Sequence, residues 1–138
     1  SVNTYLNFPG NTEEAFNFYK SVFGGEFSML MRMEDAPQQN IPAGFENKIM
    51  HIALPLSSGQ VLMGTDACEE VGHKLSTGNN FYISISADSE AEGKDLFDKL
   101  SAEGKAEVPY SKQFWGDMFG QLVDKFGGRW MIGYHEEK

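Results

Sequence analysis

The chain has 138 residues, enough for one compact domain that folds without a disulfide or a structural metal. It carries 20 Asp and Glu against 11 Lys and Arg, a net charge of −9, which argues against binding to nucleic acid or an anionic membrane and favours cationic partners. The one cysteine, Cys68, cannot form an internal disulfide, and no basic leader or long apolar run is present, so we expect a cytoplasmic protein.

The first half predicts a strand, a helix, a second strand and a hairpin. Apolar and polar residues alternate through 5–8, the period of a half-buried strand. Asn11 suits the N-cap of a helix that ends at Gly24–Gly25, and its apolar stripe consists of Ala15, Phe16, Tyr19, Val22 and Phe23. A strand at about 26–33 follows, and 51–54 pairs with 61–63 around a turn at 57–59.

The second half repeats this order. Residues 82–85, followed by Asp88, match 5–8, followed by Asn11, at positions 77 further along the chain. A helix begins after Asp88 or Ser89 and ends at Gly104, a strand follows at 106–109, and a hairpin pairs 119–122 with 129–131. This hairpin lies 68 positions after the first. The order β-α-β-β-β therefore occurs twice, as module 1 (1–66) and module 2 (79–138) of a single domain.

Two segments show little periodicity. Residues 34–47 contain two prolines and predict a long loop, which covers a site or is an inert excursion. Residues 67–78 are predicted to link the modules. One module buries little apolar surface alone, so the two are expected to share a sheet or a core.

The repeat and three local motifs resemble the PhnB-like branch of the vicinal oxygen chelate superfamily, which includes glyoxalases, bleomycin resistance proteins and extradiol dioxygenases. The motifs are 11–19, 23–26 and the aromatic and glycine-rich run 114–130. The resemblance implies an α+β fold in which two βαβββ modules form a cupped mixed sheet with helices on its outer face. It also implies a cleft and a homodimer.

The resemblance also places the positions of the metal ligands. In metal-dependent members, His and Glu ligands come from the first and last strands of each module. The matching positions here are Tyr5, Met63, Tyr82 and Met131. Thioethers and neutral phenols are poor ligands for the divalent ions of this chemistry. We therefore expect no metal cofactor and neither glyoxalase nor dioxygenase activity.

Strand alternation predicts which side chains line the cleft. Leu6, Phe8, Ile83 and Ile85 would face the helices, which leaves the alternate residues, Ser84 among them, in the cup. The expected small-molecule site is largely apolar with a few polar anchors. Its predicted ligand-binding residues are Tyr5, Asn7, Met63, Tyr82, Trp115, Phe119, Gln121 and Met131. Met63 and Met131 suit simple core filling equally well.

His51 is the candidate catalytic residue. Hairpin position and alternation direct it into the cleft, where an imidazole can act as an acid or a base near neutral pH. The alternative is a hydrogen-bonded structural histidine, since no carboxylate lies at a recognisable spacing. His73 and His135 are predicted to be solvated. Asp117 is either a catalytic acid or a turn aspartate that bonds backbone amides.

Arg32 and Arg129 are the two arginines of the predicted strands with a possible binding role. Each could hold a carboxylate or a phosphate, or form a surface or dimer salt bridge.

Two functions are compatible with this sequence. The first is a binder that resembles bleomycin resistance proteins and captures a cationic small molecule in the cleft of a homodimer. The alternative is a metal-independent isomerase, lyase or hydrolase that uses His51 with Tyr5, Tyr82 or Asp117. Relatives of this branch are often labelled 3-demethylubiquinone 3-methyltransferase, but no strand followed by a glycine-rich turn for S-adenosylmethionine is present.

Overall fold

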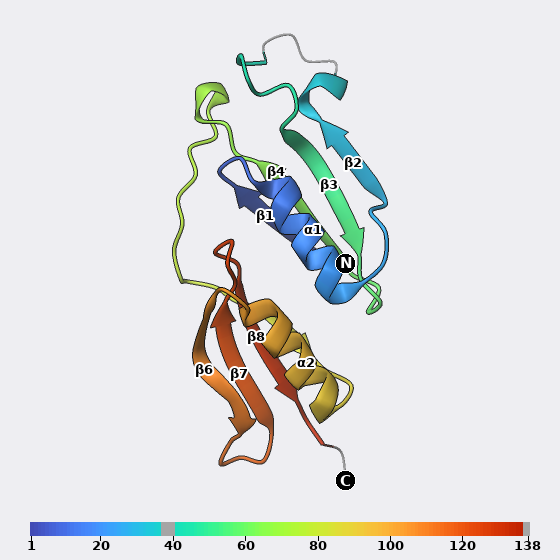
Figure 1. Ribbon diagram of the computed structural model, residues 1–138, viewed down its shortest axis with the longest axis vertical. Coiled ribbons are helices and arrows are strands. Elements are labelled where there is room, and N and C mark those ends of the chain that lie inside the picture. Colours follow the sequence, from blue (N-terminus) through green and yellow to red (C-terminus); the bar gives the residue numbers. More distant parts are fainter. Residues whose placement is uncertain (37–40, 137–138) are drawn as a thin grey trace. The chain divides into compact units, whose positions relative to one another are not determined.

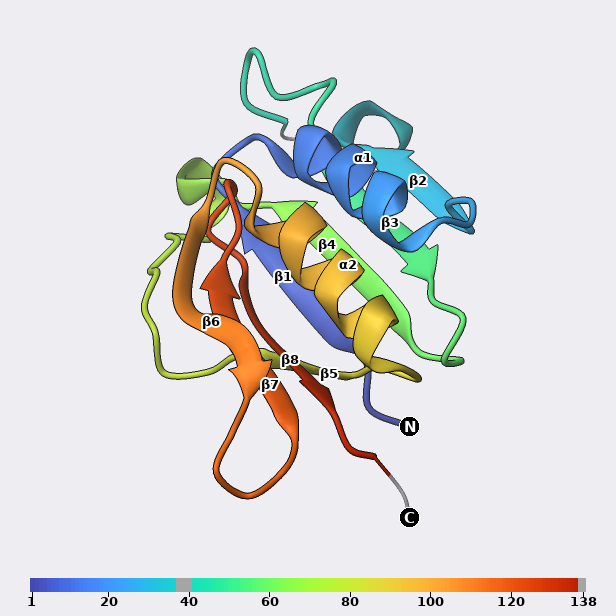
Figure 2. The same ribbon diagram turned by 60° about the horizontal axis from the view of Figure 1, so that its bottom comes forward.

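The computed structural model describes residues 1–36 and 41–136. The chain forms two compact units, Ser1–Thr77 and Gly78–Lys138. Each unit holds one four-stranded sheet and one α-helix that packs against a face of that sheet (Figures 1 and 2). The predicted α+β class is confirmed.

The first unit has the predicted order of elements. They are β1 (Thr4–Phe8), α1 (Thr12–Phe23), β2 (Met29–Arg32), β3 (Ile49–Pro55) and β4 (Val61–Asp66). The strands lie in the order β1-β4-β3-β2, with β1 parallel to β4 and the other pairs antiparallel. Two short 3-10 helices are added, η1 (Met33–Asp35) after β2 and η2 (Glu69–Val71) in the segment predicted as a linker.

The second unit repeats this topology. Its elements are β5 (Ile83–Ser86), α2 (Glu90–Ser101), β6 (Lys105–Lys112), β7 (Met118–Val123) and β8 (Arg129–Tyr134), and its strands lie in the order β5-β8-β7-β6. Strand β6 is longer than the predicted 106–109, because its pairing with β7 continues to Lys112 opposite Met118. Two register shifts accompany Pro109, which an edge strand tolerates because it needs no ladder hydrogen bond there.

The core of each unit lies between its helix and its sheet. In the first unit Leu6 and Phe8 are buried on the helix side of β1, as alternation predicted, while the alternate residues Tyr5 and Asn7 are exposed. In the second, Ile83 and Ile85 are half-buried and Ser84 is exposed. The largest fully buried side chains include Phe16, Tyr19, Ile52, Leu54, Leu62, Leu100, Leu122, Trp130 and Ile132.

A glycine and an isoleucine face each other beneath each helix. Ile52 on β3 is the register partner of Gly64 on β4, and Gly120 on β7 is the register partner of Ile132 on β8. A Cβ added to Gly64 would lie 2.6 Å from Phe16, and one added to Gly120 would lie 2.7 Å from Phe97. Neither position can hold a larger side chain, because an aromatic ring of the overlying helix lies directly against each glycine.

The two helices begin differently. Ser89 caps α2 by accepting a hydrogen bond from the backbone N–H of Glu92 at 3.0 Å, as predicted. Asn11 is the N-cap residue of α1, as predicted, but its side chain makes no capping hydrogen bond to the helix. The buried carboxylate of Asp66 instead accepts from the backbone N–H and the hydroxyl of Thr12, at 3.0 and 2.6 Å. The carboxylate of Asp66, at the end of β4, thus takes the place of the missing side-chain cap.

The predicted loop 34–47 begins within η1, and its residues 37–40 lie outside the described part of the chain. Residues 41–48 form a turn in which Phe45 donates to Pro42 and Lys48 donates to Phe45 through their backbones, both at 3.0 Å. Within the described residues, no helix is long and apolar enough to cross a membrane.

Candidate functional site

The sheet face turned away from the helix, which we call the open face, carries most of the predicted site residues. In the first unit Tyr5 on β1 is the register partner of Met63 on β4. In the second unit Gln121 on β7 is the register partner of Met131 on β8. All four side chains are at least partly exposed, so the two methionines do not belong to the fully buried cores.

A tyrosine and a histidine are hydrogen-bonded on the open face of the first unit. The hydroxyl of Tyr5 lies 3.0 Å from Nδ1 of His51, and the two ring centroids are 5.6 Å apart. Burial raises the pKa of Tyr5, and the neighbouring hydroxyl of Thr65 offsets part of that rise. Thr65 itself donates to the backbone carbonyl of Ile49 at 3.2 Å. The structure therefore brings together two predicted site residues, Tyr5 and His51, and adds Thr65.

Asn7 does not belong to this cluster of hydrogen bonds. It is exposed on β1, where its register partner is Thr65. Its side chain therefore extends the open face of the first unit toward the end of β1.

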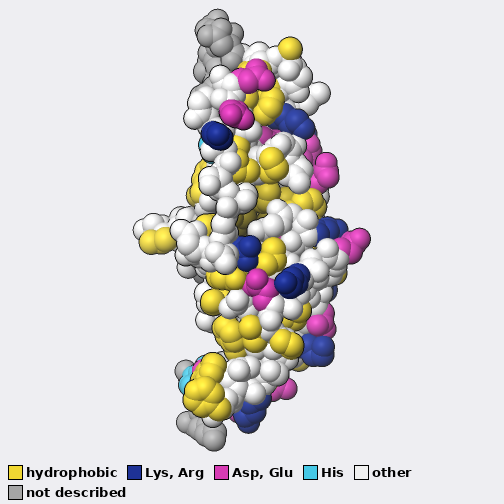
Figure 3. All heavy atoms as spheres, turned by 90° about the vertical axis from the view of Figure 1, so that its left-hand side faces the viewer, with side chains coloured by type: hydrophobic (Ala, Val, Ile, Leu, Met, Phe, Trp, Pro, Cys, Tyr) yellow, Lys and Arg dark blue, Asp and Glu magenta, His cyan; other side chains and the backbone are white. Residues whose placement is uncertain are grey.

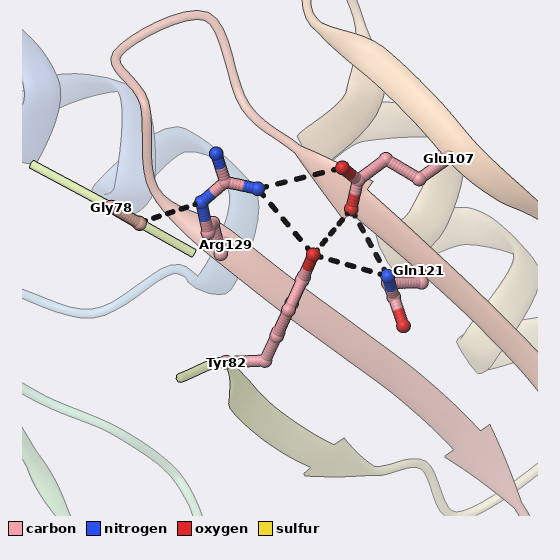
Figure 4. A network of polar contacts seen from close by, with 5 residues as sticks. All are labelled: Gly78, Tyr82, Glu107, Gln121 and Arg129. Carbon is pink, nitrogen blue, oxygen red and sulfur yellow. Dashed lines mark hydrogen bonds and ion pairs between the residues drawn. The ribbon is translucent and has the colours of Figure 1, made fainter. Parts of the chain in front are cut away.

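A larger polar network occupies the open face of the second unit (Figure 4). Tyr82, just before β5, donates to Oε1 of Glu107 at 2.7 Å. The amide nitrogen of Gln121 donates to the same Glu107 oxygen and to the Tyr82 hydroxyl, both at 3.1 Å. Tyr82 and Gln121 were predicted site residues, and the structure joins them through a carboxylate that sequence reasoning missed.

Arg129 closes the network from the start of β8. Its Nε donates to the carbonyl of Gly78 at 3.0 Å, which fixes the guanidinium, and Nη1 lies 3.4 Å from both the Tyr82 hydroxyl and Oε2 of Glu107. The guanidinium also lies over the Tyr82 ring, 5.8 Å from its centroid. Of the roles predicted for Arg129, the structure shows a salt bridge, and its partner is Glu107 of the same unit.

The carboxylate of Glu107 is kept ionised by its neighbours. The hydrogen bond from Tyr82, then that from Gln121, and the charge of Arg129 lower the pKa of Glu107. A β-bulge explains why alternation did not find this residue. Ala106 pairs with Leu122 and Val108 with Gln121, so Glu107 is the extra residue between them.

An aromatic hairpin connects β6 to β7. Phe114 is 97% exposed and Trp115 is 53% exposed, and their rings form an edge-to-face pair with centroids 4.8 Å apart. Trp115 also approaches Phe119, with 6.5 Å between ring centroids. Figure 3 shows that hydrophobic side chains reach the surface in both units. Phe114 and Trp115 are thus presented to solvent by a tight turn, with Gly116 at φ 102°.

Three further polar predictions are corrected or refined by the structure. The carboxylate of Asp117 lies 2.5 Å from Nδ1 of His135, so its bond is to a side chain and not to the turn amides predicted for it. His135 is exposed, as predicted, but this contact ties it to the residue just before β7. His73 is half-buried instead of solvated, and its backbone N–H donates to the carbonyl of Cys68 at 3.0 Å.

The side chains at the expected metal-ligand positions do not suit a divalent ion. Tyr5 and Tyr82 hold their phenols in hydrogen bonds to His51 and Glu107, and Met63 offers a thioether. Met131 offers another thioether, and its partner on β5 is Ser84, so Ser84 and not the predicted Tyr82 stands at the position of Tyr5. Over residues 1–36 and 41–136, no three His, Cys, Asp or Glu side chains are grouped so that they could hold a metal ion.

A polar depression of about 470 Å³ lies at the start of α1, away from the open face. Arg32 lines it and donates to both carboxylate oxygens of Glu13, at 2.9 and 2.8 Å. Lys48 donates to the carbonyl of Gly10 at 2.8 Å. These cations are engaged by the chain itself, and Arg32 has the salt-bridge role predicted as one of its alternatives.

Comparison with known proteins gives a family and a fold. A family model described as 3-demethylubiquinone-9 3-methyltransferase matches residues 1–133. Protein PA1353 from Pseudomonas aeruginosa is similar in structure, with 33% identity, 99% of this chain and 98% of that chain covered, and a TM-score of 0.85. A putative 3-demethylubiquinone-9 3-methyltransferase, PhnB protein, from Bacillus cereus has 28% identity, 98% and 99% coverage and a TM-score of 0.77.

A more distant structure identifies the fold in general terms. A glyoxalase/bleomycin resistance protein/dioxygenase family enzyme from Burkholderia phytofirmans PsJN covers 96% of this chain and 98% of its own, with 14% identity and a TM-score of 0.62. The repeated βαβββ order agrees with this likeness. The chain belongs to the PhnB-like family of the glyoxalase/bleomycin resistance fold, whose family model is described as 3-demethylubiquinone-9 3-methyltransferase.

Proposed function

We propose that this protein binds a small organic molecule on the open faces of its sheets without using a metal ion. The observation that carries the proposal is that each open face presents a hydrogen-bonded tyrosine, Tyr5 in the first unit and Tyr82 in the second. A partly exposed methionine, Met63 or Met131, lies on the same face. Rings and thioethers supply apolar contact, and the polar groups orient a ligand.

The charge of the chain favours a cationic ligand. A net charge of −9 raises the local concentration of cations and slows the approach of anions. Capture of a cationic drug without turnover, as bleomycin resistance proteins do, is compatible with this charge and with the open-face side chains. We propose that the binding form is a homodimer in the cytoplasm.

Bleomycin is a suitable first probe of this function. Titration of the purified protein, followed by tryptophan fluorescence and calorimetry, is expected to show saturable binding that weakens as salt screens the charge. Elemental analysis of the same sample is expected to find no stoichiometric Zn, Ni, Mn or Fe. Stoichiometric metal that returns after chelation and dialysis would contradict the proposal, and light scattering at several concentrations tests the dimer.

A metal-independent enzyme is the second candidate, and the bond between Tyr5 and His51 favours it. A ring nitrogen held at 3.0 Å from a phenol is oriented, as a catalytic imidazole must be. His51→Ala distinguishes the two candidates. A binder is expected to keep its affinity within about tenfold, because one hydrogen bond contributes about 1 kcal/mol. Loss of turnover with intact affinity would identify an enzyme.

The methyltransferase description of the family has no counterpart in the described residues. Methyltransferases of the common kind hold S-adenosylmethionine at a glycine-rich turn between a strand and a helix of a parallel sheet. Gly24 and Gly25 instead follow the end of α1, and Gly127 lies in the turn between β7 and β8. We therefore do not propose methyl transfer.

A further inference from the structure

The bond between Tyr5 and His51 has two possible directions, and each implies a different ligand. If Tyr5 donates, Nδ1 of His51 accepts and the ring proton is on Nε2. If His51 donates from Nδ1, then Nε2 carries a lone pair. Because Nδ1 is taken up by Tyr5, Nε2 is the nitrogen left to meet a ligand.

The neighbouring hydroxyl favours donation by Tyr5. Thr65 gives its one proton to the carbonyl of Ile49 at 3.2 Å, and that carbonyl can only accept. The phenol proton of Tyr5 therefore has two candidate acceptors, Oγ1 of Thr65 and Nδ1 of His51. An imidazole nitrogen is far more basic than a hydroxyl oxygen, and it lies at 3.0 Å, so it receives the proton.

The second unit also contains an open-face tyrosine, and its role as donor is unambiguous. Ser84, opposite Met131, occupies the register position that Tyr5 has opposite Met63, and Tyr82 lies two residues before it and bonds Glu107 at 2.7 Å. An ionised carboxylate can only accept, so Tyr82 must donate. In both units an open-face tyrosine thus gives its proton to a side chain of its own sheet. Its oxygen then only accepts further hydrogen bonds, as the Tyr82 oxygen does from Gln121.

We propose that Tyr5 holds His51 as the Nε2–H tautomer, so that the open face of the first unit presents a hydrogen-bond donor and takes an acceptor oxygen or nitrogen of the ligand. This inference rests on the proposed binding function and adds the chemistry of one contact. Tyr5 is a positioning residue in it. A neutral imidazole N–H polarises a bound carbonyl, whereas a general base at Nε2 would need the other tautomer.

The tautomer can be measured without any ligand. Long-range 1H–15N correlation of the imidazole rings, on the full chain labelled with 15N-histidine at pH 8, distinguishes the two nitrogens of each ring. His51 is expected to give the Nε2–H pattern, and Tyr5→Phe is expected to move it toward a mixture. Thr65→Val should leave the pattern unchanged. The Nδ1–H pattern as the major form in the unaltered chain would overturn the inference.

Two aromatic probes of similar size test the ligand chemistry. Pyridine accepts a hydrogen bond and pyrrole donates one, so titration of the labelled protein should shift the His51 signals at several-fold lower pyridine than pyrrole concentration. A preference for pyrrole would contradict a donor at Nε2. If neither probe binds, the proposed binding function is weakened while the tautomer spectrum of the free protein still decides the inference.

Discussion

Tyr82 and Glu107 form the shortest bond of the open-face networks, with 2.7 Å between the phenol oxygen and Oε1 of the carboxylate. The residues come from the start of the second unit and from the bulge of β6. Gln121 and Arg129 approach the same carboxylate from β7 and β8. One carboxylate thus fixes the position of a phenol, an amide and a guanidinium on one sheet face.

This network predicts a specific acid sensitivity. The pKa of Glu107 is lowered in the folded chain, so its contribution to stability is fully present above the ordinary glutamate value of 4.5 and is lost as pH falls through the lowered value. Urea midpoints between pH 7 and pH 3 should fall less steeply for Glu107→Gln than for the unaltered chain. Glu70→Gln, at an exposed position, serves as control. Equal slopes for all three proteins would contradict the prediction.

Gly64→Ala is expected to destabilise the first unit by about 1 to 3 kcal/mol, because the new methyl group would overlap the ring of Phe16, 2.6 Å away. Chemical denaturation measures the loss. Gly133→Ala is the matched control in a strand, since its Cβ would meet its nearest neighbour, the carbonyl of Met118, at an ordinary 3.6 Å. A loss of the same size in both variants would contradict overlap with Phe16 as the cause, since Gly→Ala without overlap should not destabilise.

Asp66→Asn is expected to lower the free energy of unfolding by roughly 2 kcal/mol. Oδ2 of Asp66 accepts from the backbone N–H of Ile49 at 2.7 Å while Oδ1 accepts from Thr12, so an amide would place its NH2 against a donor whichever way it turned. Asp98→Asn, at an exposed ion pair with Lys94, should change stability by less than about 0.5 kcal/mol. Similar effects of the two changes would show that the burial of Asp66 is unimportant.

Phe114→Ser tests whether this exposed ring contributes to the stability of the single chain or to association between copies. The ring is 97% exposed in the single chain, so the substitution should leave the free energy of unfolding within about 0.5 kcal/mol at low protein concentration. Denaturation curves at two concentrations and bleomycin titration check this. A loss of stability that grows with protein concentration would show that the ring is buried between copies, while a change confined to affinity would place it beside the ligand.

The repeat could be predicted because its signals are local. Alternation in 5–8 identified the buried face of β1 correctly, and Ser89 followed by Glu92 marked the start of α2. The side chains of β5 also alternate as expected between half-buried and exposed. These patterns depend on neighbours within four residues, which a single sequence displays directly.

The polar contacts could not be predicted because they are long-range or depend on a bulge. Asp66 replaces the side chain of Asn11 at the start of α1 from 54 residues away. Glu107 reaches Gln121 only because one extra residue in β6 breaks the alternation. His51 lacked a recognisable partner for the same reason, since Tyr5 lies 46 residues before it.

The pairs Ile52–Gly64 and Gly120–Ile132 have the same two residue types in opposite strands. Position 120 follows 52, and 132 follows 64, by the same 68 positions that relate the two hairpins. The two units therefore have the same total side-chain volume at this pair, but the glycine and the isoleucine are on exchanged strands. Each helix packs one ring over the glycine, Phe16 over Gly64 on β4 and Phe97 over Gly120 on β7. The two units therefore share one topology but pack their helices over different strands. A chimera that joins the helix of one unit to the sheet of the other would need to exchange both members of the pair together with the ring.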